Sequence, residues 1–243
     1  GAGLIALWPR EQRVAIRAIA LATTSLSMLM AVWAFAGFTG AAEGLGGFKY
    51  VHRIAWVDAL GIHYLVGADG INIGLILMAA IVSFAAVCVS HSIEERFKEF
   101  HFLMLLMITG ILGAFMSIDL FFFYFFHELA LIPTFIMIGV WGRGEQRQYA
   151  TYKMTLYLTL GALVALAGLV LLYIQSGAKT FDLVALGQQL EAQPLRPESQ
   201  SLIFGLLLVG FGILVSLWPF HSWAPIGYGA APTATAMLHA GVL

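Results

Sequence analysis

Apolar residues fill long uninterrupted runs along this chain, and charged residues or Gly/Pro clusters separate the runs. Each run is close to the roughly 20 residues that cross a bilayer as a helix. The pattern predicts seven membrane helices or parts of them, at 16–38, 71–92, 100–118, 120–141, 151–174, 201–218 and 233 onward. The apolar start at 1–8 is too short for a full span, and we interpret it as the tail of a first helix.

The loops between the runs predict which way the helices cross. One set of loops carries seven basic residues and the other set four, with Lys153 inside a helix. Because Lys and Arg concentrate on the cytoplasmic side, the first set (Arg10, Arg13, Arg17, Arg96, Lys98, Arg143 and Arg147) is predicted to be cytoplasmic. The longer segments 39–70 and 176–200 then lie outside. The first of them is typical of an interfacial hairpin or a short amphipathic helix, and Asp119, between two spans, is expected to be an exposed turn acid.

The run that begins at Ser201 is interrupted near Pro219. Pro225, Gly227, Gly229 and Pro232 follow within a stretch that carries no charge, and apolar character then resumes. Broken backbone at membrane depth is tolerated where it packs in protein or lines a wet cavity. The residues alone leave two alternatives open, a broken membrane helix or a charge-free cytoplasmic loop after an ordinary one.

The composition supports a polytopic membrane protein. Of 243 residues, 60% are hydrophobic and 10% charged, and the mean hydropathy is +0.90. The formal net charge of −1 offers no basic surface for nucleic acid, and the single Cys88 allows no disulfide framework. The start at Gly1 and the stop at Leu243 inside an apolar run lead us to expect a fragment of a longer protein.

Glu128 is the strongest candidate for chemistry. It lies well inside a span that otherwise holds no charge, where a carboxylate is costly unless it faces protein or water. Such acids usually mark ion or proton paths, although a protonated structural Glu between helices is the alternative. Lys153 could reach a proton path, or its long stem could extend to the cytoplasmic surface.

Three histidines, His127, His221 and His239, lie in or beside apolar segments, where imidazole can relay protons near neutral pH. Each could equally be a satisfied interior group. Their spacing gives no metal-binding pattern, so no metal is expected. The chain has no glycine-rich phosphate loop, no cysteine cluster and no nucleophile elbow. Any reaction must therefore be vectorial or belong to partner subunits.

Several motifs taken together resemble the antiporter-like membrane subunits of respiratory complex I. They are Phe126-His127-Glu128 followed by Pro133, then Trp141-Gly142, Lys153, Pro219-Phe-His221-Ser-Trp223, Ala231-Pro232-Thr233 and Ala240-Gly241. Within that superfamily the chain is most similar to the subunit M group of bacterial NADH-quinone oxidoreductases. The segment from Trp56 to Gly70 and the Glu followed by Pro after a phenylalanine-rich stretch favour this group over the related L and N subunits.

The resemblance implies an all-α polytopic membrane protein, an antiporter-like helical bundle with a broken helix near Pro219. It implies N-terminal transmembrane helices over 1–98, with an extracytoplasmic segment at 39–70, and the first part of a proton-translocating core over 99–243. It further implies Glu128, Lys153, His221 and His239 as proton-path candidates. The bilayer and other membrane-arm subunits of complex I are the expected partners, in the bacterial inner membrane.

The resemblance also implies a division of labour within an NADH:quinone oxidoreductase. NADH, FMN, iron–sulfur clusters and quinone are expected on other subunits, with no cofactor and no redox centre in this chain. Alternatives are a subunit of a Mrp-type cation/proton antiporter or of a membrane-bound hydrogenase, and a structural subunit that does not conduct.

One position departs from the family pattern. Members usually place a lysine five residues before the Pro of the Pro-x-His-x-Trp motif, where this chain has Leu214 with only Ser216 nearby. The segment 224–228 also lacks the usual acid and His. Either the path uses other groups, such as His221 and His239, or proton translocation through this subunit is impaired.

Overall fold

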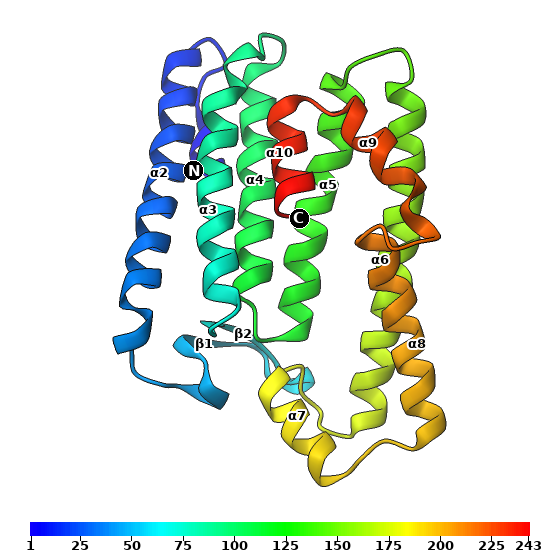
Figure 1. Cartoon of the computed structure of the whole chain (residues 1–243). Coiled ribbons are helices and arrows are strands. Elements are labelled where there is room, and N and C mark those ends of the chain that lie inside the picture. The colour runs from blue at the N-terminus through cyan, green and yellow to red at the C-terminus, as the bar shows by residue number, and fades with distance from the viewer.

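The computed structural model describes residues 1–243, and six of its helices are long and apolar enough to cross a membrane (Figure 1). They are α2 (Arg13–Gly37), α3 (Asn72–Val89), α4 (Phe97–Met116), α5 (Leu120–Trp141), α6 (Arg147–Ser176) and α8 (Pro197–Leu214). Six of the seven apolar runs are therefore confirmed as helices long enough to span, while the last run forms a shorter helix at Thr233–Gly241. A helix pairs its own backbone N–H and C=O groups, which a membrane requires. Because these runs hold little but apolar residues, each helix also presents apolar side chains on all faces.

Short elements complete the chain. The N-terminal α1 (Ala2–Leu7) packs its buried Ile5 against α4, and Nζ of Lys98 donates to the carbonyl oxygens of Ala6 at 2.9 Å and Trp8 at 2.7 Å. α7 (Leu183–Ala192) lies in the predicted outer segment, and α9 (Ala224–Ala230) and α10 (Thr233–Gly241) follow the break. The backbone N–H of Arg143 donates to the carbonyl of Ala230 at 2.7 Å, which ties the α5–α6 loop to the end of α9.

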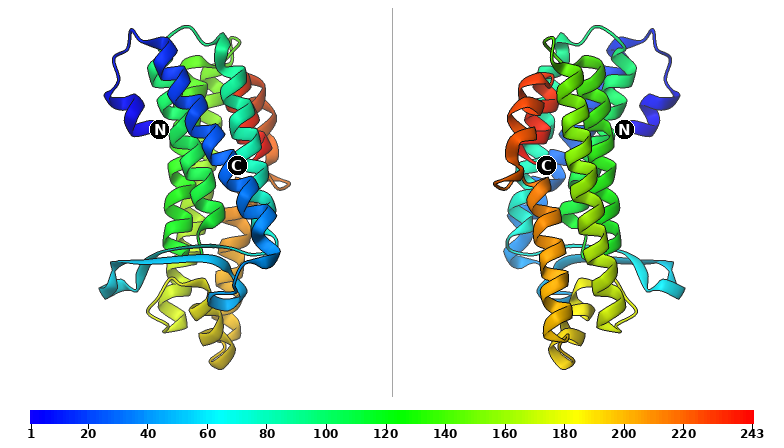
Figure 2. Two further views of the ribbon diagram at one scale, coloured as in Figure 1. Left: turned by 90° about the vertical axis from the view of Figure 1, so that its left-hand side faces the viewer. Right: turned by 90° about the vertical axis from the view of Figure 1, so that its right-hand side faces the viewer.

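A β-hairpin lies across one end of the helices and projects beyond them (Figure 2). Its strands are β1 (Lys49–Val57) and β2 (Ile62–Ala68), paired antiparallel with Ala55 opposite His63. β2 buries Ile62 and Leu65, whereas β1 is largely exposed. Of the two structures expected for the first outer segment, the hairpin is confirmed.

Asp119 corrects the expectation of an exposed turn acid, because its exposed fraction is 0%. Its Oδ1 accepts from the backbone N–H groups of Phe121 at 2.9 Å and Phe122 at 3.2 Å, so it caps α5. Its Oδ2 accepts from the N–H of His63 in β2 at 3.1 Å. An N-cap acid satisfies helix N–H groups that have no partner within the helix. Here the same carboxylate also attaches the hairpin to α5.

The second segment that is predicted to lie outside, 176–200, closes over this junction. The N–H of Leu120 donates to the carbonyl of Phe181 at 2.9 Å, and the N–H of Leu183 donates to the carbonyl of Ile118 at 2.9 Å. Asp182 caps α7 in the same way as Asp119 caps α5. The hairpin, the start of α5 and α7 therefore form one hydrogen-bonded layer at this end of the molecule.

The break near Pro219 is confirmed, and it begins earlier than the apolar run suggests. α8 ends at Leu214, where the N–H of Ser216 donates to Ile213 and the N–H of Leu217 donates to Gly212 at 2.7 Å. These two bonds form a Schellman motif, with Ser216 at the left-handed position (φ 54°) that glycine usually takes. The indole N–H of Trp223 then donates to the carbonyl of Ile213 at 3.0 Å, which returns the chain to the bundle.

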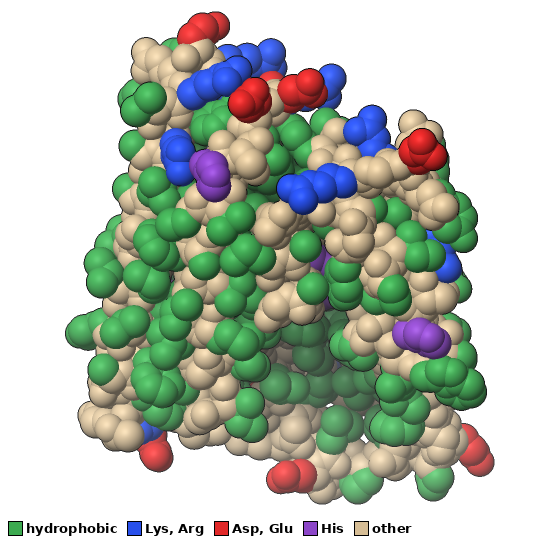
Figure 3. Space-filling model, turned by 45° about the horizontal axis from the view of Figure 1, so that its top comes forward, with side chains coloured by type: hydrophobic (Ala, Val, Ile, Leu, Met, Phe, Trp, Pro, Cys, Tyr) green, Lys and Arg blue, Asp and Glu red, His purple; other side chains and the backbone are tan.

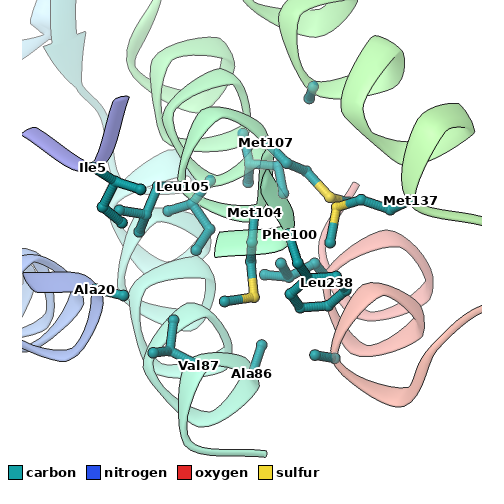
Figure 4. Packing of buried hydrophobic residues seen from close by; sticks show 14 of the residues in the cluster. Ile5, Ala20, Ala86, Val87, Phe100, Met104, Leu105, Met107, Met137 and Leu238 are labelled. Carbon is teal, nitrogen blue, oxygen red and sulfur yellow. The ribbon is translucent and has the colours of Figure 1, made fainter. Parts of the chain in front are cut away.

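The largest buried cluster joins both ends of the chain. It brings together side chains of α1 to α5 with Ala234 and Leu238 of α10 (Figure 4). Phe100, Met104 and Met107 of α4 lie at its centre and contact helices on several sides. α10 is therefore fixed against the N-terminal helices, while α6 and α8 pair with each other at the other side of the bundle (Figure 1).

Candidate functional site

Glu128 lies in the middle of α5, with its side chain about one-third exposed (32%). One turn earlier, the hydroxyl of Tyr124 donates to the carbonyl of Ala162 in α6 at 3.3 Å, which fixes this face of α5 toward α6. Oε1 of Glu128 is buried and has no hydrogen-bond partner. The ionisable side chain within ion-pair range of Glu128 is His127, whose Nδ1 lies 4.0 Å from Oε1. The carboxyl group is therefore held inside the span without a Lys or Arg.

Lys153 belongs to the first half of α6 and does not pair with Glu128. Its Nζ lies 5.9 Å from the ring centroids of both Tyr149 and Tyr157, where an ammonium group gains from the negative ring faces. The hydroxyl of Tyr157 in turn accepts from Ser222 at 3.2 Å, in the broken segment. Lys153 therefore lies on α6 next to a tyrosine that contacts the broken segment, and it does not pair with the acid.

A cavity of about 200 Å³ lies between α4, α5, α6, α8 and the two short helices. Hydrophobic side chains form nearly all of its wall, and Leu214, the position where the family pattern has a lysine, is among them. His127 and His239 are its two lining residues outside the hydrophobic class. The space-filling view shows this part of the molecule hollowed, with hydrophobic walls, whereas charged side chains gather at the end that carries the basic loops (Figure 3).

His239 is the more deeply buried of the two histidines, with an exposed fraction of 5%. Its ring packs edge-on against Trp223 at 5.8 Å and Tyr228 at 5.4 Å between centroids. Neither ring nitrogen has a protein partner, and Nδ1 of His127 has none either. The break therefore places two aromatic rings of the returning chain around one imidazole.

The structure separates the residues that the sequence had grouped. His127 and His239 line the same cavity, and Oε1 of Glu128 lies 4.0 Å from Nδ1 of His127, whereas His221 is exposed and does not line the cavity. His127 was not among the proton-path candidates that the family resemblance implied. The signal for it was its spacing, because Phe123, His127 and Leu131 recur every four residues on one face of α5, and all three line the cavity. No three His, Cys, Asp or Glu side chains cluster closely enough to hold a metal ion.

Comparison with known proteins places these features in a family context. Residues 117–243 match the family model described as NADH:quinone oxidoreductase/Mrp antiporter, transmembrane. The chain is 32% identical over 234 residues to the NADH-quinone oxidoreductase subunit M of Rhodobacter capsulatus, with 93% of this chain and 44% of that protein covered. It is 34% identical over 195 residues to the NAD(P)H-quinone oxidoreductase chain 4 of Gloeobacter violaceus, with 80% and 36% covered. The chain thus spans less than half the length of these relatives.

Solved structures give the same picture. A chain of respiratory complex I from Thermus thermophilus superposes with a TM-score of 0.81 at 29% identity, covering 97% of this chain and 46% of that one. A chain of the Mrp complex from Dietzia superposes with a TM-score of 0.78 at 22% identity, covering 97% and 42%. The second likeness concerns the fold alone. Both support the antiporter-like bundle that the sequence predicted.

Proposed function

Since the chain belongs to the family of NADH:quinone oxidoreductase and Mrp antiporter membrane subunits, we propose that it translocates protons within an NADH-quinone oxidoreductase. It is a multi-pass membrane protein and a subunit of a multisubunit assembly, as its relatives are. NADH oxidation and quinone reduction fall to other subunits in this proposal, which also hold the cofactors. Its place is the bacterial inner membrane, against other membrane-arm subunits.

The observation that carries this proposal is the environment of Glu128. One oxygen of the Glu128 carboxyl group is buried without a hydrogen bond, and the group has no Lys or Arg partner. A carboxylate in this position is costly to ionise inside a membrane, and binding a proton removes that cost. A group that is neutral when protonated and costly when charged responds to any movement of nearby charge. Glu128 can therefore take up and release a proton as neighbouring charges approach or withdraw.

The substitution Glu128→Gln tests the proposal, because Gln keeps the size and hydrogen-bonding capacity of the side chain and removes the titratable group. The assembled complex should still transfer electrons, while the number of protons translocated per quinone reduced should fall. The measurement is proton uptake into proteoliposomes that contain the assembled complex, alongside the electron-transfer rate.

Glu145 offers a matched control, since it is an exposed acid in the loop between α5 and α6. Glu145→Gln removes one carboxylate from the same protein and should leave pumping unchanged. Unchanged pumping by Glu128→Gln at an unchanged electron-transfer rate would remove Glu128 from the proton path.

A second candidate function is a structural subunit that spaces and seals the membrane arm without conducting. Leu214 favours it, because this side chain gives the cavity an apolar wall where the family pattern has a lysine. Glu128→Gln also separates this candidate, which requires pumping to be indifferent to the acid. Co-purification with quinone-reducing subunits distinguishes both from a Mrp-type antiporter or hydrogenase subunit.

A further inference from the structure

The cavity beside Glu128 has an unusual set of groups for a space inside a membrane bundle. Its titratable side chains are the imidazoles of His127 and His239 and the phenol of Tyr228. The other lining residues, which come from α4, α5, α6, α8, the broken segment and α10, carry no charge. Glu128, next to His127, is the one acid within ion-pair distance of either imidazole. Any proton that enters this space must therefore bind to one of very few groups.

The ring nitrogens in the cavity lack protein partners. Nδ1 of His127 and both nitrogens of His239 are buried without a hydrogen bond. A neutral imidazole has one donor and one acceptor nitrogen, and leaving them unpaired in an apolar wall is unfavourable. A cavity of about 200 Å³ has room for several waters, at about 30 Å³ each. Water between the two rings would satisfy these nitrogens and connect them.

The two imidazoles share one apolar cavity, which His127 lines from α5 and His239 lines from α10. Two imidazolium ions facing the same apolar space repel each other, because the low dielectric does little to screen them. A second proton in this cavity is therefore disfavoured, so the occupancy of one ring should depend on the other.

We propose that His127 and His239 form a two-histidine proton-binding site, which extends from Glu128 across the cavity to α10. This inference rests on the proposed function and names the groups that continue its path. Oε1 of Glu128 and Nδ1 of His127 are 4.0 Å apart, a gap that a small side-chain rotation or one water molecule would close.

Each step of the relay moves one proton and no electrons. The O–H bond of Glu128 breaks as an N–H bond forms at Nδ1 of His127, giving an imidazolium. His127 then releases the proton from its other nitrogen to water in the cavity, and that water protonates His239. Because both nitrogens of His239 are free, it can accept the proton on one and release another from the second. Each ring is then neutral in the opposite tautomer, and it recovers its starting tautomer by a ring flip or by proton exchange with water in the cavity.

Two substitutions test the site, each with a matched control. His127→Gln and His239→Gln keep a hydrogen-bonding side chain in the cavity but cannot carry a proton at neutral pH. His52→Gln makes the same exchange at an exposed position on β1, outside the cavity. In proteoliposomes of the assembled complex, both cavity variants should lose as much proton translocation per quinone reduced as Glu128→Gln, and His52→Gln should lose none.

A second measurement reports the protonation of the two rings directly and does not depend on whether a variant still pumps protons. Infrared difference spectra of the complex with isotope-labelled histidine, recorded against pH, should show an imidazolium band that titrates. That band should disappear in His239→Gln and shift its midpoint in His127→Gln, since the two rings share one proton. A residue that only packs in the cavity wall would leave no such coupled titration. If a variant does not assemble, the band and its midpoint in the unmodified complex decide.

The outcomes separate this inference from the function on which it rests. Loss of pumping in Glu128→Gln with full pumping in both cavity variants would overturn the two-histidine site and leave the proposed function standing. Full pumping in Glu128→Gln with loss in both cavity variants would support the site and move the entry of the proton away from Glu128. Full pumping in all three, with no titrating band, would overturn both.

Discussion

Asp119 shows at the scale of one residue how a polar side chain can be buried at the edge of a membrane bundle. Three backbone N–H groups point at its carboxylate, two from the first turn of α5 and one from His63 of the hairpin. Burial raises the pKa of Asp119 above its ordinary value, and these three donors partly offset that rise. Asp119 therefore caps α5 and attaches strand β2 to it, and both contacts depend on the protonation state of one carboxyl group.

The pH dependence of stability follows from this shift and can be tested with Asp119→Asn. Because its pKa is raised in the folded protein, Asp119 takes up a proton on folding between the ordinary and the raised pKa. Its contribution to stability is complete below the ordinary Asp pKa and is lost as pH rises through the raised one. Thermal unfolding in detergent should show the stability of the unmodified protein falling relative to Asp119→Asn across that interval.

Asp182→Asn is the control for this prediction, because Asp182 caps α7 through the same two kinds of backbone bond. It reports what the exchange of a capping Asp for Asn does by itself. Asp119→Ala, which also removes the cap, should cost about 1–2 kcal/mol. A stability difference between Asp119→Asn and the unmodified protein that stays constant with pH would contradict the prediction.

At the scale of helices, the position of α5 depends on its close approach to α4. A side chain at Gly110 of α4 would meet the backbone N of Ala130 and the carbonyl oxygen of Phe126, each 2.6 Å from the added Cβ. Both atoms belong to the part of α5 that carries His127 and Glu128. The absence of a side chain at one position therefore sets the distance between two helices and the placement of the candidate site.

Gly110→Val should destabilise the protein, because the added atoms push α4 and α5 apart. Overpacking of this kind costs about 1–3 kcal/mol. Thermal unfolding of the purified protein measures the loss, and proton translocation should fall with it as α5 shifts.

Gly74 provides the comparison, since a Cβ there would meet nothing within 4 Å. Gly74→Val makes the same chemical change within a membrane helix and should cost much less. Equal losses for the two variants would mean that the contact between α4 and α5 is not what Gly110 provides.

At the scale of the whole molecule, the two ends of the bundle differ in structure. One end carries the short loops with most of the basic residues, and the other carries the hairpin and α7 (Figures 1 and 3). The alternation of helices places every predicted cytoplasmic loop at the first end. The sidedness itself stays a prediction from the basic residues.

Labelling in intact cells tests the orientation. After Cys88 is replaced by Ser, Glu94→Cys and Gln188→Cys each place one exposed thiol at opposite ends of the bundle. A membrane-impermeant maleimide added outside should label Gln188→Cys and should label Glu94→Cys only after the membrane is permeabilised. Ready labelling of Glu94→Cys in intact cells would reverse the predicted topology.

The sequence alone determined the spans and Glu128 as the candidate acid, and it left two alternatives each for the first outer segment and for the stretch near Pro219, between which the structure chose the hairpin and the broken helix. These follow from hydropathy, from turn-forming residues and from a charge inside an apolar run, which are local properties of the chain. Only the tertiary structure decided that Asp119 is buried, that His127 and His239 share a cavity, and that His221 stands apart from it. The reason is physical: a run that is apolar on every face does not encode which face meets which neighbour. That choice is made by contacts between helices far apart in sequence, such as Gly110 against Phe126 and α10 against α3 and α5.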